Sequence, residues 1–217
     1  MTRASIVFDL DGTLIDSAPD IQAIANGLLE AEGAAPLSLT ETRSFIGSGV
    51  PAFVSRARKA RDVPSDRQAP RVAAFIEVYH TAFSRTELYP GARDMLAQLH
   101  RRHALGICTN KVAGPTHAVL EHFGIDHYFG SIFGGDSLPS RKPDPAMLHA
   151  AFGALDGTRR IYVGDSEVDA ETAERAGVPF LLFSGGYRKS PVMQIPNQGV
   201  FDAHAELESL VEKTLVS

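Results

Sequence analysis

The chain has almost no cysteine, since Cys108 is the only one in 217 residues. An intramolecular disulfide framework is therefore excluded, and the apolar neighbour Ile107 favours a buried thiol. Long hydrophobic runs are also missing, because Asp9 interrupts the first apolar stretch after only a few residues. We expect neither a signal-peptide core nor a membrane span. The expected location is the reducing cytoplasm.

Positive charge is scarce as well. The chain has 21 Lys and Arg against 26 Asp and Glu, which gives a formal net charge of −5. Binding to a nucleic-acid backbone depends on clustered cations, so no nucleic-acid partner is expected. The one basic cluster, Arg56 to Arg61, lies among alanines and is typical of a solvated helix face. An anionic substrate would have to be attracted locally, by a metal ion and a few placed cations.

Hydrophobic residues make up 44% of the chain, enough for one large domain or for a main domain with a modest insert. Short, continuously apolar runs predict strands over residues 5–8, 104–109, 160–165 and 178–183. Such runs indicate strands covered on both faces, as in a parallel sheet. Helical patterns lie between them at residues 90–102, 114–123, 145–155 and 169–176. The predicted fold class is α/β, a Rossmann-like doubly wound parallel sheet.

The pattern changes between the first strand and Tyr89-Pro90-Gly91. Residues 16–85 contain several helical stretches and no convincing strand. We therefore expect a core domain made of residues 1–15 and 88–217, with an all-helical insert at 16–87. The two connections would lie close in space and act as hinges.

Polar residues stand at the ends of three predicted strands: Asp9 and Asp11, Thr109 and Asn110, and Asp165 and Ser166. In an open α/β sheet the ligand binds at this edge. Lys142 precedes a predicted helix and supplies a cation for the same place. Carboxylates from two strands would repel each other there unless a cation neutralised them. The candidate ligands are oxygens, with no suitably spaced His or Cys, which favours Mg²⁺ over Zn²⁺ and indicates phosphoryl chemistry.

These residues carry a resemblance. The run Val7-Phe8-Asp9-Leu10-Asp11-Gly12-Thr13-Leu14 resembles DxDGT, the first signature of the haloacid dehalogenase superfamily. Thr109, Lys142 and Gly164-Asp165-Ser166, with Asp169, match the remaining signatures in order. The resemblance covers essentially the whole chain.

The resemblance implies a mechanism and roles for individual residues. Asp9 would attack phosphorus and form an aspartyl-phosphate, while Asp11 would protonate the leaving oxygen and later activate water. Asp9, Asp165 and the carbonyl of Asp11 would bind Mg²⁺. Thr109 and Lys142, together with Asp169 and Ser166 behind them, would complete the catalytic group, with Asp169 orienting Lys142 or a metal-bound water. Contacts to the phosphate or substrate are expected from Leu10, Thr13, Asn110, Gly47, Ser48 and Gly49.

The insert resembles the small helical cap of the phosphoglycolate phosphatase and β-phosphoglucomutase branch of the superfamily. Gly47-Ser48-Gly49 would form a loop that dips into the active site, with amides that contact a substrate carboxylate. A small organic phosphate, with 2-phosphoglycolate first among them, is therefore the expected substrate.

Several alternatives stay open. Asp9 to Thr13 also fits a simple polar turn, and the two glycines of the loop also fit a plain helix-to-helix connection. A phosphosugar phosphatase, a β-phosphoglucomutase-like phosphotransferase and an inactive binding or regulatory protein are the rival functions. A phosphonate hydrolase would need a desolvated insert lysine, and Lys59 is the only lysine there. Monomer and homodimer are equally compatible with the sequence.

Overall fold

A six-stranded parallel sheet forms the centre of the computed structural model, which describes residues 3–216. The strand order is β5-β4-β1-β6-β7-β8, and each neighbouring pair is parallel. The strands are β1 Ala4–Phe8, β4 Ala104–Cys108, β5 Phe129–Phe133, β6 Arg159–Gly164, β7 Phe180–Phe183 and β8 Gly199–Phe201. The predicted fold class is confirmed.

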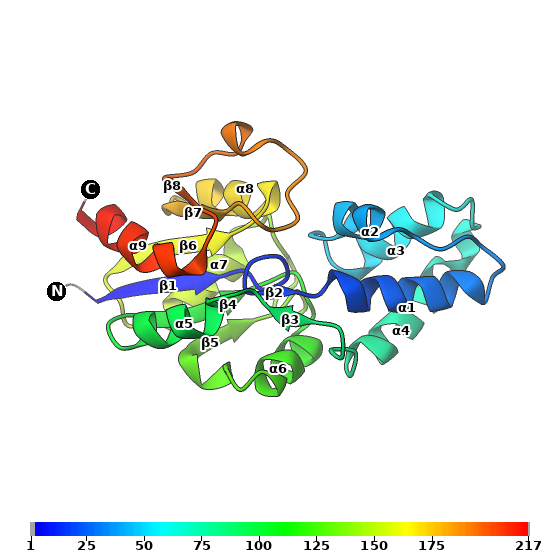
Figure 1. Ribbon diagram of the computed structural model, residues 1–217, viewed down its shortest axis with the longest axis horizontal. Coiled ribbons are helices and arrows are strands. Elements are labelled where there is room, and N and C mark those ends of the chain that lie inside the picture. Colours follow the sequence, from blue (N-terminus) through cyan, green and yellow to red (C-terminus); the bar gives the residue numbers. More distant parts are fainter. Residues whose placement is uncertain (1–2, 217) are drawn as a thin grey trace.

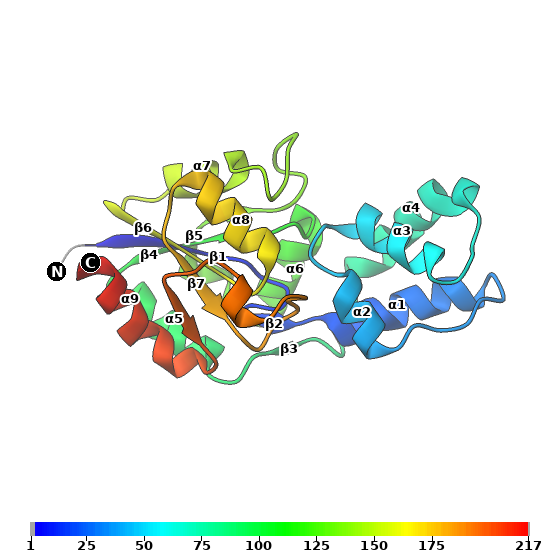
Figure 2. The same cartoon turned by 90° about the horizontal axis from the view of Figure 1, so that it is seen from above.

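Helices cover both faces of this sheet (Figure 2). Because successive side chains of a strand point to opposite faces, Ile6 and Phe8 of β1 pack into one cluster and Val7 into another. The first cluster includes α5 Ala92–His100, α6 Ala113–His122 and α9 Leu207–Val216. The second includes α7 Ala146–Gly153 and α8 Glu167–Ala176. The expected core helices are present, with ends that differ from the predicted ones by at most two residues.

The inserted segment folds as helices that lie beside the sheet (Figure 1). They are α1 Ala18–Glu30, α2 Leu39–Phe45, α3 Val50–Lys59 and α4 Gln68–Tyr79. These helices bury their own hydrophobic cluster, in which Phe53, Phe75 and Tyr79 stack edge to face or at a tilt. The two chain connections pair antiparallel as β2 Ile15–Asp16 and β3 Glu87–Leu88. The chain therefore enters and leaves the insert side by side.

One residue from the sheet side belongs to the insert's cluster. Tyr187 is buried there, and its hydroxyl accepts hydrogen bonds from the amides of Ser17 and Ala18 at 2.9 and 3.1 Å. The first amides of a helix have no partner within the helix, so Tyr187 caps the start of α1.

Two strands of the sheet escape prediction from the sequence. β5 is an edge strand in which Gly130 and Ser131 interrupt the apolar run, and only part of it is buried. β8 has three residues, too few for a periodic signal. Short 3-10 turns complete the structure at Ser65–Arg67, Asp126–Tyr128, Val192–Gln194 and His204–Glu206.

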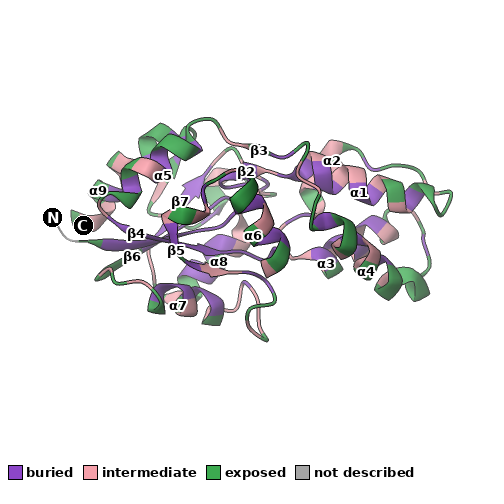
Figure 3. Ribbon diagram, turned by 90° about the horizontal axis from the view of Figure 1, so that it is seen from below, coloured by how far each residue is buried: buried purple, intermediate pink, exposed green. Residues whose placement is uncertain are grey.

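Burial follows this architecture. The strands of the main sheet are mostly buried, while the helices show buried and exposed bands (Figure 3). Across residues 3–216, none of the helices combines the length and the apolar composition that crossing a bilayer requires.

Candidate active site

The candidate site lies where three neighbouring strands end. Asp9 follows β1, Thr109 follows β4 and Asp165 follows β6, and β1 is paired with both of the other strands. The chain runs from β1 to β4 on one side and later to β6 on the other, and a ligand crevice forms at such a reversal. A pocket opens there between the sheet and the insert, lined by Asp9, Asp11, Ile21, Ile46, Gly47, Gly49, Val50, Phe53, Phe75, Tyr79, Thr109, Asn110, Lys111, Lys142 and Ser166.

The turn after β1 is held by backbone hydrogen bonds. The carbonyl of Leu10 accepts from the amides of Thr13, Leu14 and Ile15. Gly12 has a φ of +91°, and a Cβ there would lie 2.5 Å from Oδ2 of Asp165. Only glycine therefore lets the turn approach Asp165 so closely.

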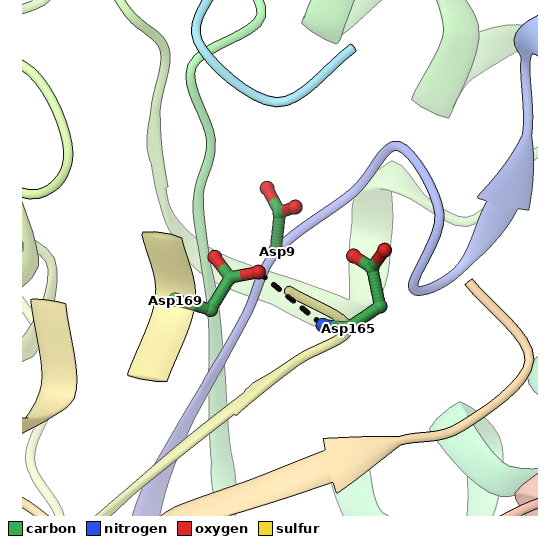
Figure 4. A group of neighbouring side chains, drawn as sticks. All are labelled: Asp9, Asp165 and Asp169. Carbon is green, nitrogen blue, oxygen red and sulfur yellow. Dashed lines mark hydrogen bonds between the residues drawn. The ribbon is translucent and has the colours of Figure 1, made fainter. Parts of the chain in front are cut away.

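Three buried carboxylates converge at this edge. Ligand oxygens of Asp9, Asp165 and Asp169 lie within 4.8 Å of one another (Figure 4). Burial, together with the charge of Asp169, raises the pKa of Asp9 to about 6 despite the opposing effect of Lys142. Burial and the two neighbouring carboxylates also raise the pKa of Asp165 well above its usual range. The cluster therefore has too little positive charge to hold three anions, which fits a site for a bound cation.

The hydrogen bonds indicate which carboxylates are open to a metal. Asp169 is occupied, because its Oδ1 accepts from Lys142 at 2.7 Å and its Oδ2 accepts from the Ser166 hydroxyl at 2.6 Å. In Asp165 each oxygen accepts one bond, from the Thr13 hydroxyl at 2.9 Å and the Tyr187 amide at 2.6 Å. Each oxygen of Asp165 thus keeps a free lone pair.

Asp9 provides the second open carboxylate, since its Oδ1 is buried and has no hydrogen-bond partner among the described residues. Nζ of Lys142 lies 2.9 Å from this oxygen, close enough for an ion pair but not directed as a hydrogen bond. These residues fit a hard divalent cation such as Mg²⁺, which prefers carboxylate and carbonyl oxygens.

Lys142 is a buried cation shared by two carboxylates. Its Nζ lies 2.9 Å from Asp9, 2.7 Å from Asp169 and 2.8 Å from the hydroxyl of Tyr162. Burial alone would lower the pKa of Lys142, but the two carboxylates raise it above its usual range. Conversely, Lys142 outweighs the effect of burial on Asp169 and lowers the pKa of that group. The side chain of Asn110 holds the backbone of Lys142 through both its N–H and its carbonyl.

Asp11 lines the pocket together with Asp9, but its hydrogen-bond partners are different residues. Its Oδ1 accepts from the Ser17 hydroxyl at 2.6 Å and from Nζ of Lys111 at 3.3 Å. The site thus has two carboxylates in different environments, since Asp9 belongs to the acidic cluster and Asp11 contacts Ser17 at the start of the insert. Such a pair suits a nucleophile and a neighbouring proton donor.

Residues 6–183 match the family model described as haloacid dehalogenase-like hydrolase. The chain belongs to this family. It is 47% identical over 214 residues to a phosphoglycolate phosphatase of Cereibacter sphaeroides (strain ATCC 17029 / ATH 2.4.9), with 97% of this chain and 98% of the relative covered. It is 40% identical to a phosphoglycolate phosphatase of Rhodobacter capsulatus, with 96% of each chain covered. A crystal structure of a predicted phosphoglycolate phosphatase from Haemophilus somnus superposes with a TM-score of 0.89 at 29% identity, covering 97% of this chain and 99% of that one.

In this haloacid dehalogenase-like hydrolase the structure brings most of the sequence-predicted residues together. Asp9, Asp11 and Lys142 line the pocket together with Thr109, Asn110, Gly47, Gly49 and Ser166. Asp165 and Asp169 are not among the lining residues, but their carboxylates converge on Asp9. The hydroxyl of Thr109 accepts from the amide of Lys111 at 3.3 Å. Asn110 donates to the carbonyl of Gly47 at 2.9 Å and so joins the sheet side to the insert loop.

Three of the predicted substrate contacts lie elsewhere. The side chain of Leu10 is in the hydrophobic core, so any contact between Leu10 and the phosphate would have to come from its backbone. The hydroxyl of Thr13 is fully buried and bonded to Asp165, and that of Ser48 accepts from Arg56 at 3.1 Å. Neither Thr13 nor Ser48 is among the residues that line the pocket. Their contact with substrate stays a prediction, and in this structure their hydroxyls support neighbouring groups.

Other residues of the site are not evident from the sequence. Lys111 follows Asn110 directly and is buried in the pocket lining, where burial lowers its pKa and Asp11 opposes that shift. The one feature of the sequence that points to Lys111 is its position just after the end of β4, where ligands bind. Tyr162, Tyr79 and Tyr187 each bring a hydroxyl to a charged or amide partner of the site. Tyr162 lies in an apolar strand, Tyr79 ends a helix and Tyr187 lies in a loop, and none of these positions has a local sequence pattern that predicts its hydrogen bonds.

Proposed function

We propose that this hydrolase is a Mg²⁺-dependent phosphomonoesterase that acts through an aspartyl-phosphate on Asp9, with 2-phosphoglycolate as its substrate. The observation that carries the proposal is the placement of Asp9 between Lys142 and Asp165. Its Oδ1 lies 2.9 Å from Nζ of Lys142, and carboxylate oxygens of Asp9 and Asp165 lie within 4.8 Å of each other. Relatives named phosphoglycolate phosphatase, up to 47% identical over nearly the whole chain, support the substrate.

The first half of the reaction transfers the phosphoryl group to the protein. A carboxylate oxygen of Asp9 attacks phosphorus, the bond between phosphorus and the ester oxygen breaks, and Asp11 gives its proton to that oxygen. Glycolate leaves with this proton. Lys142 and the Thr109 hydroxyl hold the phosphoryl oxygens as charge develops on them. Asp9, Asp165 and the Asp11 carbonyl would hold Mg²⁺, which would neutralise the negative charge of the phosphoryl group when bound.

The second half returns Asp9 to its starting state. Asp11, now a carboxylate, takes a proton from a water molecule as that water attacks phosphorus. The bond between phosphorus and the Asp9 oxygen breaks, and inorganic phosphate leaves. Both halves use the same two carboxylates, so the protein ends with the protons it began with.

The insert is proposed to be a cap domain, residues 16–87, that covers the pocket and hinges at β2 and β3. Its apolar wall would exclude water while the aspartyl-phosphate forms. We place the enzyme in the cytoplasm, acting on a small phosphorylated metabolite.

Phosphate release from a panel of esters tests the proposal. We expect the highest kcat/KM with 2-phosphoglycolate, dependence on added Mg²⁺ and loss of activity in EDTA. Asp9→Asn should abolish release while the matched exposed variant Asp66→Asn stays active. Isomerisation of a sugar phosphate would favour the phosphotransferase alternative, and near-normal turnover by Asp9→Asn would overturn the nucleophile assignment.

A further inference from the structure

A second buried lysine lines the pocket and has no place in the steps above. Only 3% of the Lys111 side chain is exposed, and it lies among residues of both the sheet side and the insert. A lysine is rarely buried this far without a charged or polar partner, so its contacts are informative.

The contacts of Lys111 come from the two sides of the pocket. Its Nζ lies 3.3 Å from Oδ1 of Asp11 and hydrogen-bonds the hydroxyl of Tyr79, the last residue of α4. The same ammonium lies 3.7 Å from the centre of the Tyr79 ring. An ammonium has three N–H donors, and these contacts use two. The third has no acceptor among the described residues and is open to a ligand.

The other lysine of the pocket is not available for this purpose. Lys142 donates hydrogen bonds to Asp169 and Tyr162 and forms an ion pair with Asp9, so its charge is already shared between the two carboxylates of the acidic cluster. The remaining pocket wall from the insert is apolar, formed by Ile21, Ile46, Val50, Phe53 and Phe75. Lys111 is therefore the cation of the pocket lining that can meet a second anionic group.

Pairwise contacts link the charged groups of the pocket lining one to the next. Lys142 contacts Asp9, Asp11 follows Asp9 by two residues, and Lys111 contacts Asp11. A phosphate ester bound for reaction has its phosphorus at Asp9 and its ester oxygen at Asp11. The group attached beyond that oxygen then falls next to Lys111 and Tyr79.

We propose that Lys111, held by the Tyr79 hydroxyl, binds the substrate's carboxylate and so selects phosphate esters of short 2-hydroxy acids. The inference rests on the proposed function, since it assigns a residue to the acid end of the same substrate. A charge-assisted hydrogen bond in a mostly apolar pocket discriminates strongly between a carboxylate and a methyl group.

The test compares 2-phosphoglycolate with ethyl phosphate, which has the same chain length without the carboxylate. In Lys111→Met we expect kcat/KM for 2-phosphoglycolate to fall by about 100-fold, mainly through KM, and that for ethyl phosphate to change by less than about 3-fold. Inhibition by glycolate should weaken in this variant, while inhibition by inorganic phosphate should not. Lys59→Met, a change at an exposed lysine of α3, serves as the matched control.

Two further variants keep the test informative if Lys111→Met folds poorly. Lys111→Arg should retain a preference for the acid, and Tyr79→Phe should lose part of it, by about 5-fold, because only the hydroxyl is removed. Equal loss on both esters would overturn the proposal and show that Lys111 acts through Asp11. An unchanged preference in Lys111→Met would also overturn it.

Failure of the proposed function has a different signature. It would appear in the unaltered protein, as no preference for 2-phosphoglycolate over ethyl phosphate. A preference in the unaltered protein that survives all three variants would instead leave the function standing and remove Lys111 from recognition.

Discussion

The sheet side and the insert side of the pocket differ in kind. The sheet side contributes buried charges at strand ends, Asp9 and Lys142 among them, each tied to partners of the same region. The insert contributes apolar side chains and a loop with two glycines of positive φ, Gly47 and Gly49. A reaction in which charge develops needs the fixed charged groups of the sheet side. Selection of a substrate by its shape needs only the apolar surface of the insert. Lys111 connects the two sides, because it is a charged residue of the sheet side that hydrogen-bonds a side chain of the insert.

The largest expected effect follows from removing the central charge of the sheet side. Lys142→Met leaves Asp9 and Asp169 buried without their cation, and breaking a buried pair costs about 3–5 kcal/mol of the free energy of unfolding. Phosphate release should fall by roughly 10³-fold because a donor to the phosphoryl oxygens is lost. Urea unfolding and steady-state kinetics measure the two effects, with Lys59→Met as control. Stability and activity close to those of the unaltered protein would mean that the sheet side does not depend on this charge.

A smaller effect is expected when the proton donor is removed. Asp11→Asn should lower kcat by about 10²-fold on alkyl phosphates, since the leaving alkoxide needs a proton. Aryl phosphates, which leave without protonation, should lose less. Comparing kcat for the two ester classes checks this, and equal losses would count against Asp11 as the acid.

The insert side should respond through affinity more than through rate. Gly49 has φ +81° and ψ 169°, a conformation almost confined to glycine, and a Cβ there would lie 2.9 Å from Nη1 of Arg141. Gly49→Ala should therefore displace the loop and raise KM for 2-phosphoglycolate by roughly 10-fold, with kcat changed by less than about 3-fold. Gly33→Ala is the matched control, because Gly33 also has a positive φ and its Cβ would meet open space, but it is not among the residues that line the pocket. A drop in kcat without a change in KM in Gly49→Ala would show that the insert affects the rate of the reaction and not the affinity for substrate.

The smallest effect concerns a place that belongs to neither side. His103 is buried, and burial lowers its pKa below the usual value of 6.5. Its Nδ1 accepts a hydrogen bond from the amide of Ala4 at 3.3 Å, which requires that nitrogen to be unprotonated. The neutral form is favoured in the folded protein; its contribution to stability is therefore complete above pH 6.5 and is lost as the pH falls below that value. Urea midpoints at pH 7.5 and 5.0 should separate more in the unaltered protein than in His103→Gln. Identical pH dependence would show that His103 is not a stability sensor.

The sequence predicts the parts of the molecule whose signal is local. Continuously apolar runs predict β1, β4, β6 and β7, and the rule that ligands gather at strand ends then brings Asp9 and Asp165 together. Edge strands such as β5 are missed because one side of them faces solvent and their apolar pattern is broken.

Contacts that join distant segments are the part that sequence reasoning cannot supply. Lys142 lies in a loop before a proline, where most lysines are solvated, and only packing against Asp169 shows that it is buried. Tyr187 likewise reads as a loop residue, although its amide donates to Asp165 and its hydroxyl caps α1. Such pairs are separated by tens of residues, and no local pattern encodes the distance between them.

The antiparallel pairing of β2 with β3 also bears on how this chain could change over evolutionary time. Both ends of the insert meet at Ile15 and Leu88, which are paired across one short ladder. A segment whose ends are already adjacent can be lengthened, shortened or exchanged without shifting the register of the main sheet. The β2–β3 pair is thus a graft point, at which a new selective surface can be joined to chemistry that stays in place.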